Sequence, residues 1–106
     1  MAATLLAIFK RPEGGEDAME EFLRRYLDEH MPLIEKVPGL RSSVVEKVAQ
    51  RYAGDDLVIV TRMEFDDGAA LEAGMASDEM RVAGRNLREI APGLLTLVAL
   101  EEEPVS

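Results

Sequence analysis

The stretch that decides the fold is Leu57–Phe65, which reads LVIVTRMEF. It is short and rich in β-branched and other apolar residues, a composition typical of a β-strand. Alternate side chains of a strand point to opposite faces of its sheet. One face of this strand would carry Leu57, Ile59, Met63 and Phe65, and the other would carry Val58 and Val60. Both sets are apolar, so we expect both faces to be buried.

Working outward from this strand, the neighbouring segments supply three more strands. The preceding run Leu40–Ala49 is joined to it by a short turn that contains Gly54, which predicts an antiparallel hairpin. Two further short apolar runs, Thr4–Lys10 and Leu94–Leu100, have the same strand-like composition.

Two amphipathic helices fill the gaps between these strands. Apolar residues recur at three-and-four spacing from Glu16 to about Glu35, and again from Asp78 to about Ile90. A short helical turn, Ala69–Met75, is expected to begin after Asp67 as its N-cap. Since Pro32 has no N–H to donate, we expect the first helix to kink or restart there.

The order of elements is therefore β-α-β-β-α-β, which predicts one α+β domain of ferredoxin-like fold over residues 1–106, with a tail at 102–106. Its sheet would be four-stranded and antiparallel, with both helices on one face. Two helices cover only one of two apolar faces, and a large exposed apolar patch favours a partner. We therefore expect a homodimer that pairs through the free sheet face.

The composition restricts partners and cofactors. The formal net charge is −9, from 21 acidic and 12 basic residues, whereas nucleic acids and anionic membranes require a basic surface. The chain has no cysteine and a single histidine, so neither a disulfide nor a metal site is predicted by residue spacing. No phosphate-binding loop and no membrane-spanning stretch are visible. We expect a cytoplasmic protein without a cofactor.

The only histidine, His30, continues the apolar stripe of the first helix and lies beside Pro32. Two interpretations stay open: a core histidine satisfied by a nearby carbonyl or carboxylate, and a general acid/base at a pocket between this helix and the sheet. Tyr26 lies one helical turn earlier on the same stripe. Its hydroxyl could donate to a substrate oxygen or belong to an ordinary core residue.

A second group of residues consists of candidates for ligand contact. Arg62 interrupts the Val58 and Val60 face, where it could bind a carboxylate or phenolate, or pair with a glutamate across strands or across the dimer. Methionines and phenylalanines could form an adaptable pocket wall or simply fill the core. The residues concerned are Phe9, Phe22, Met63, Phe65 and Met80.

Three segments in this element order resemble the EthD family, named for a protein linked to ethyl tert-butyl ether degradation: FKRPEG (9–14), HMPL (30–33) and VPGL (37–40). The likeness covers roughly Leu5 to Leu100. It implies a dimeric α/β barrel, a superfamily that includes muconolactone isomerases, polyketide cyclases, cofactor-free quinone-forming monooxygenases, haem-degrading enzymes and stress-response proteins.

The sequence departs from these relatives in two respects. Haem-degrading and antibiotic-monooxygenase relatives use a tryptophan with Asn and His, and this chain has no tryptophan, which disfavours those reactions. EthD-like proteins typically carry an Asp late in the second helix, where Asn86 stands here.

The residues and the resemblance together lead to one main functional hypothesis. The protein would bind a small apolar, oxygen-bearing molecule, polyketide-like or aromatic. His30 would act as general acid/base in a cofactor-free cyclisation, isomerisation or oxidation. The alternative is a non-catalytic, ligand-binding or accessory dimer of an oxidative degradation or stress system. A purely structural role would instead predict no pocket at His30.

Overall fold

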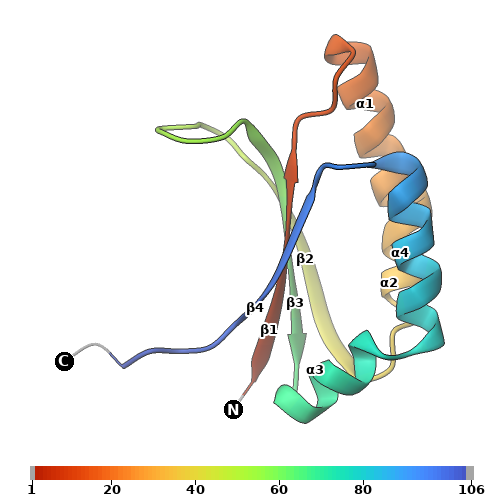
Figure 1. Cartoon of the computed structure of the whole chain (residues 1–106), viewed down its shortest axis with the longest axis vertical. Coiled ribbons are helices and arrows are strands. Elements are labelled where there is room, and N and C mark those ends of the chain that lie inside the picture. Colours follow the sequence, from red (N-terminus) through yellow and green to blue (C-terminus); the bar gives the residue numbers. More distant parts are fainter. Residues whose placement is uncertain (1, 105–106) are drawn as a thin grey trace.

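The computed structural model describes residues 2–104 as one layer of helices on one four-stranded sheet (Figure 1). The elements follow in the order β1 (Ala3–Lys10), α1 (Gly15–Arg25), η1 (Tyr26–His30), α2 (Met31–Ile34), β2 (Leu40–Lys47), β3 (Leu57–Phe65), α3 (Gly68–Met75), α4 (Asp78–Ile90) and β4 (Leu95–Leu100). The expected strands and helices are all present.

The sheet has the strand order β2-β3-β1-β4, and each neighbouring pair is antiparallel. β1 and β3 are central, and β2 and β3 form the predicted hairpin. This topology confirms the α+β ferredoxin-like fold. None of the helices in residues 2–104 has the length and apolar composition needed to cross a membrane.

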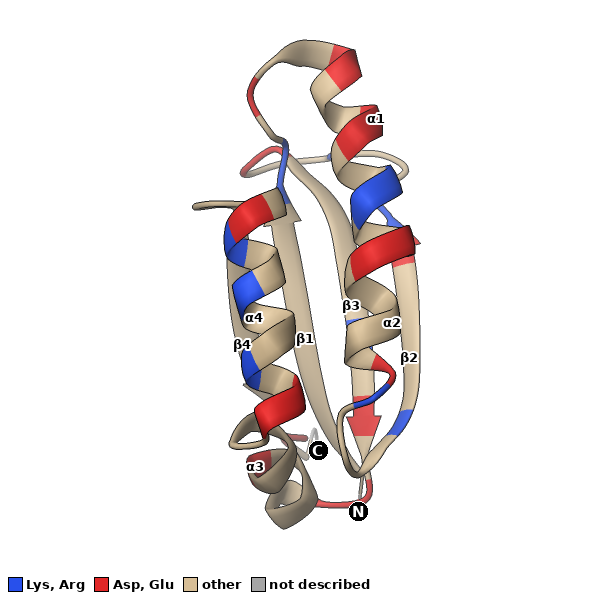
Figure 2. Ribbon diagram, turned by 90° about the vertical axis from the view of Figure 1, so that its right-hand side faces the viewer, with Lys and Arg blue, Asp and Glu red and all other residues tan. Residues whose placement is uncertain are grey.

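Both long helices cover the same face of the sheet, as the sequence predicted (Figure 1). Seen from the helix side, acidic and basic residues recur along both helices (Figure 2). The first helical segment packs on β1 through the rings of Phe22 and Tyr26 against Phe9, and the ring centroids lie 5.0–5.8 Å apart. This cluster fixes the first helical segment against the sheet.

The first helix differs from the expected continuous run Glu16–Glu35. It is divided into α1, the π-helical turn η1 and the short α2. Pro32 has no N–H for the carbonyl of Asp28, and the ladder shifts register just before it, so that the Met31 N–H bonds the Tyr26 carbonyl. The predicted disturbance is therefore real, and it takes the form of a π turn.

Other boundaries differ from the sequence predictions by one or two residues. β2 ends at Lys47 instead of Ala49, although the Val48 N–H still bonds the Val58 carbonyl at 2.9 Å. Asp67 is the N-cap of α3, as predicted, and its Oδ1 accepts a hydrogen bond from the Ala70 N–H at 2.8 Å.

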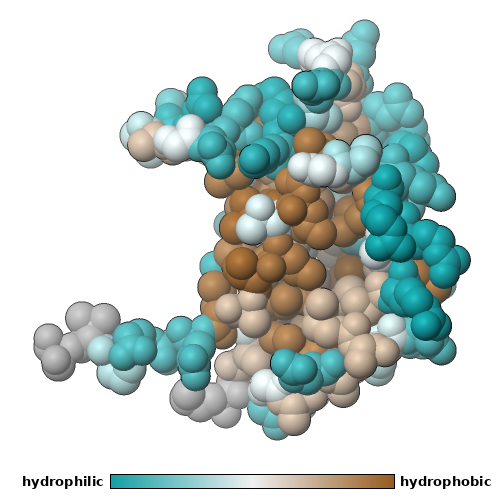
Figure 3. All heavy atoms as spheres, viewed as in Figure 1, coloured by the Kyte–Doolittle hydropathy of each residue, from teal (hydrophilic) through white to brown (hydrophobic). Residues whose placement is uncertain are grey.

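The sheet face away from the helices is apolar at its centre. Strand register places Leu6 beside Val98 and Ile8 beside Val60 on this face. Val98 is 39% exposed. The β2–β3 loop and the segment after β4 project beyond this face and leave a hollow between them (Figures 1 and 3). The chain thus has a second apolar surface, which its own helices do not cover.

Candidate functional site

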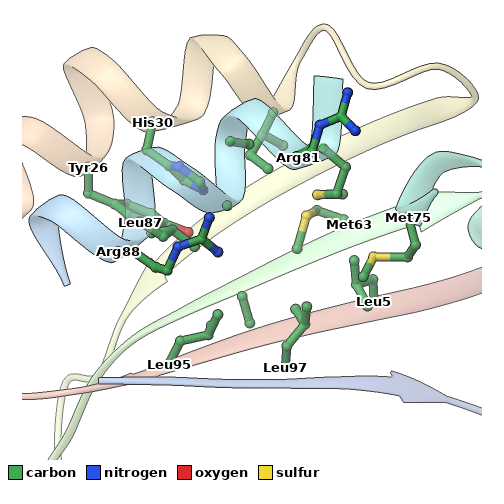
Figure 4. A pocket seen from close by; sticks show the side chains of 15 residues that line it. Leu5, Tyr26, His30, Met63, Met75, Arg81, Leu87, Arg88, Leu95 and Leu97 are labelled. Atoms are coloured by element: carbon green, nitrogen blue, oxygen red, sulfur yellow. The ribbon is translucent and has the colours of Figure 1, made fainter. Parts of the chain in front are cut away.

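A cavity of about 240 Å³ lies between the helix layer and the sheet. Figure 4 shows Tyr26 and His30 from the helix layer, and Leu95 and Leu97 from the sheet, around the same space. Its wall is mainly apolar, and its lining residues are Leu5, Ala7, Tyr26, His30, Ile34, Met63, Met75, Met80, Arg81, Ala83, Gly84, Leu87, Arg88, Leu95 and Leu97. Because a cavity reaches His30, the structure contradicts the hypothesis of a structural protein without a pocket.

His30 is the last residue of the π turn and is only 2% exposed. Its Nδ1 lies 3.1 Å from Oδ1 of Asn86 on α4. No hydrogen-bond partner of Nε2 is found in residues 2–104. Every fully buried side-chain N or O atom in these residues has a partner, so Nε2 is not fully buried. Nε2 therefore retains access to the cavity that the ring lines.

Asn86 connects His30 to an ion pair at the surface of the helix layer. Its Nδ2 lies 3.5 Å from Oε1 of Glu29. Glu29 in turn accepts two hydrogen bonds from the Arg25 guanidinium, at 2.9 and 3.0 Å. This guanidinium holds the pKa of the Glu29 carboxyl below its usual range, so Glu29 is ionised.

The environment of His30 favours the neutral imidazole. Burial lowers the pKa of His30 from its ordinary 6.5 to about 4, and the hydrogen bond to Asn86 opposes this only in part. At neutral pH the ring is therefore uncharged, and one of its nitrogens carries a lone pair. Such a ring can accept a hydrogen bond or a proton.

Tyr26 packs on His30, with ring centroids 5.1 Å apart and an interplanar angle of 27°. Its hydroxyl is 2.5 Å from Oγ1 of Thr61 on β3. Burial raises the pKa of Tyr26 to about 12, so the phenol stays protonated. The ring of Tyr26 lines the cavity, while its hydroxyl is already occupied by Thr61.

The structure brings together only some of the predicted ligand-contact residues. Met63 and Met80 line the cavity with His30 and Tyr26. Phe9, Phe22 and Phe65 are buried at 0–3% exposure but do not line it.

Arg62 lies on the opposite face of the sheet, exposed between Leu6 and Val44 in register, so it is not part of this cavity. Within residues 2–104 it forms no cross-strand pair with a glutamate, and the expected pair across the dimer stays a prediction.

Two arginines on α4 were missed by the sequence analysis. Arg81 and Arg88 both border the cavity (Figure 4). Arg81 pairs with Asp78, and Nη1 of Arg88 would lie 3.9 Å from a Cβ at Gly84, so Arg88 folds back over the cavity wall. The sequence did contain a pattern that could have identified them. The two arginines are seven residues apart, and each directly follows an apolar residue of the buried stripe, Met80 or Leu87.

In the described part of the chain, no three His, Asp or Glu side chains come close enough to form a metal site. The polar groups of the cavity wall are instead one imidazole, one occupied phenol and two guanidinium groups.

No family model and no curated protein matches this sequence. Among solved structures, an ethyl tert-butyl ether d (EthD) family protein from Bacillus halodurans C-125 is 31% identical, with a TM-score of 0.85 over 97% of this chain and 100% of its own. A dimeric ferredoxin-like protein of unknown function from Bacteroides fragilis NCTC 9343 is 19% identical, with a TM-score of 0.68 over 95% of this chain and 96% of its own.

A third similar structure is SnoaB, a cofactor-independent oxygenase from Streptomyces nogalater. It is 13% identical, with a TM-score of 0.60 over 98% of this chain and 95% of its own. At such identities the last two structures show the shared fold alone.

Proposed function

Because this chain belongs to the EthD family, sharing 31% of its residues with a member over 97% of its length, we propose that it binds a small, largely apolar, oxygen-bearing molecule and moves a proton on it through His30. The observation that carries this proposal is the cavity wall itself. One neutral, titratable ring lines an otherwise mostly apolar space.

Proton removal is the step that the arrangement supports best. Nε2 of His30 would take a proton from a C–H bond next to a carbonyl, and the electron pair would remain on the ligand as an enolate. Such an enolate can start a cyclisation, an isomerisation or a cofactor-free oxidation of a polyketide-like or aromatic compound. The guanidinium groups of Arg81 and Arg88 at the rim favour the negative charge that develops.

The size of the cavity favours a ligand of about two fused rings. An engineered apolar cavity of about 150 Å³ binds benzene, and this one measures about 240 Å³. We extend the chemistry of the cofactor-independent oxygenase that shares the fold to this chain as one variant of the proposal.

The test uses 2-tetralone, a two-ring ketone whose C1–H is acidified by both the ring and the carbonyl. In D2O, the protein should accelerate the replacement of this hydrogen by deuterium, followed by NMR. A His30→Gln variant should lose about 10²- to 10⁴-fold of the acceleration, which is typical for a positioned base.

The control for this test is Val82→Gln on α4, because Val82 is exposed and lies outside the cavity. Exchange that is equally fast with His30→Gln would refute a catalytic role for His30.

A second function is favoured by the low pKa of His30. A base with a pKa of about 4 lies far below the neutral range in which proton transfer is most efficient. The non-catalytic alternative is therefore a ligand-binding or accessory dimer, for which 2-tetralone should bind without any exchange of its C1 hydrogen.

We also propose that two copies of the chain pair through the outer sheet face. This face is apolar at its centre, with Leu6, Ile8, Val60 and Val98 side by side in register. Similar structures from Bacteroides fragilis, Jannaschia and Thermobifida fusca are described as dimeric, which supports the proposal.

A further inference from the structure

A continuous chain of side-chain contacts runs from the surface of the helix layer to the cavity. It begins at Arg25, passes through Glu29 and Asn86, and ends at Nδ1 of His30. The Asn86 contacts measure 3.5 Å to Glu29 and 3.1 Å to His30. Since Asn86 is on α4 and the other three are on α1 and η1, the chain also joins two helical segments.

The ion pair of Arg25 and Glu29 fixes the direction of the hydrogen bonds from Glu29 through Asn86 to His30. An ionised Glu29 accepts hydrogen bonds and donates none, so the Asn86 amide must turn its NH₂ toward Glu29. The carbonyl oxygen of Asn86 then faces His30 and needs a donor. A neutral imidazole has only one N–H, and this requirement places it on Nδ1.

We infer that Asn86, oriented by Glu29 and Arg25, is a positioning residue that holds His30 as the Nδ1–H tautomer and so makes the cavity selective for ligands that present a hydroxyl group, phenolic or enolic, to Nε2. The ligand half of this inference rests on the proposed function of the cavity. The tautomer half depends on the protein alone.

The rest of the cavity wall agrees with a hydroxyl-bearing ligand. The Tyr26 hydroxyl already forms one hydrogen bond, with Oγ1 of Thr61. A ligand carbonyl next to Nε2 would place two lone pairs against each other, whereas a hydroxyl would donate to the imidazole. The remaining polar wall groups, Arg81 and Arg88, are cations on α4 and donate only.

The tautomer can be read directly by NMR of protein labelled with ¹⁵N-histidine, because the chain contains one histidine. We expect a protonated, pyrrole-type Nδ1 and an unprotonated, pyridine-type Nε2 at neutral pH. The opposite assignment in the wild-type protein would overturn the inference.

Variants test each link of the chain. Asn86→Leu removes the acceptor and should shift the ring toward the Nε2–H form, whereas Asn86→Asp keeps an acceptor and should retain the Nδ1–H form. Glu29→Gln lets the Asn86 amide turn either way and should give a mixture. The matched control is Glu21→Gln on α1, whose ion pair with Arg24 at 3.7 Å does not contact Asn86, and it should leave the spectrum unchanged.

The results of these variants decide the roles separately. An unchanged spectrum in a folded Asn86→Leu protein would refute the role of Asn86. An unchanged spectrum in Glu29→Gln would refute the orienting role of Glu29 in the same way.

The ligand class is tested with three probes of one shape: 2-naphthol, 2-methoxynaphthalene and naphthalene. The wild type should bind 2-naphthol about tenfold more tightly than 2-methoxynaphthalene, as one buried hydrogen bond allows. In Asn86→Leu this preference should fall to about twofold or less. Equal binding of 2-naphthol and 2-methoxynaphthalene by the wild type, or binding of none of the probes, would overturn the ligand class.

The results that would overturn this inference differ from the result that would refute the proposed proton transfer. Absence of deuterium exchange in 2-tetralone, with the expected tautomer and the expected 2-naphthol preference, would refute proton transfer and leave this inference standing.

Discussion

At the scale of the residue, the properties of His30 come from its position more than from its identity. An exposed histidine titrates near neutrality, but this one is 2% exposed and its pKa is lowered by burial to about 4. Burial keeps the ring neutral, and its Nδ1 contacts Asn86, a residue 56 positions away in sequence. The sequence predicted a histidine on an apolar stripe, with either a core role or a pocket role. In the structure the ring contacts Asn86 at Nδ1 and lines a cavity, and its role as a general acid/base stays a prediction.

This burial predicts how stability depends on pH. Because the pKa of His30 in the folded protein lies below its ordinary 6.5, the unfolded chain binds more protons between about pH 6.5 and pH 4. The stabilising contribution is complete above this range and is lost as the pH falls through it. Between about pH 7.5 and about pH 4.5, the wild type should lose about 2 kcal/mol more unfolding free energy than His30→Gln.

Urea denaturation at the two pH values measures this difference. The acidic side chains titrate in both proteins, so the comparison isolates His30. Parallel losses in the two proteins would contradict the assignment of His30 as a buried neutral base.

At the scale of the element, the helices meet the sheet through close contacts that fix the cavity. The π turn before Pro32 places Tyr26 and His30 on the side of the helix that faces the sheet. Farther along the chain, α3 packs on the sheet at Gly74, where the Phe65 ring leaves no room for a side chain. The π turn and Gly74 are local features of the sequence. Each shapes the packing only because another element lies against it.

The contact at Gly74 predicts a loss of stability in Gly74→Ala. The added Cβ would lie 2.8 Å from Cε2 of Phe65 and 3.2 Å from the Pro38 carbonyl oxygen, so the ring or the backbone must move. We expect a loss of about 1–3 kcal/mol in unfolding free energy, as for other overpacked cores. Chemical denaturation measures it.

The matched control is Gly68→Ala in the same helix, where a Cβ would meet no atom within 4 Å. This control should change stability by about 0.5 kcal/mol or less. Equal effects of the two substitutions would show that helix propensity, and not packing on Phe65, sets the outcome.

At the scale of the whole molecule, the two faces of the sheet have different roles. The helices cover one face and leave the cavity between the layers. The other face, with Leu6, Ile8, Val60 and Val98 at its centre, has no cover within the described chain. Charged residues recur along both long helices (Figure 2), whereas the outer face is apolar at its centre, beside Arg62, and is the surface suited to a second copy.

This arrangement predicts that Val98→Glu prevents pairing. Val98 is already 39% exposed in the single chain, so a glutamate there costs the monomer little, whereas a buried and unpaired charge strongly disfavours an interface. Light scattering coupled to size exclusion should show a dimer for the wild type and a monomer for the variant.

Val82→Glu, on the exposed side of α4 at 44% exposure, is the control and should remain a dimer. A wild type that is monomeric at micromolar concentrations would overturn pairing through this face.

The sequence by itself determined the element order, the antiparallel hairpin, the apolar character of both sheet faces, and the disturbance of the first helix at Pro32. Each of these follows from local spacing, turn chemistry or a missing N–H, all of which are properties of neighbouring residues. Only the tertiary structure decided which side chains surround the cavity. The pairing of Asn86 with His30, the occupation of the Tyr26 hydroxyl by Thr61, and the placement of Arg62 on the opposite face join residues distant in sequence or depend on strand register. Such contacts form only when the elements pack, because burial and hydrogen-bond geometry are set by the neighbours that packing brings together.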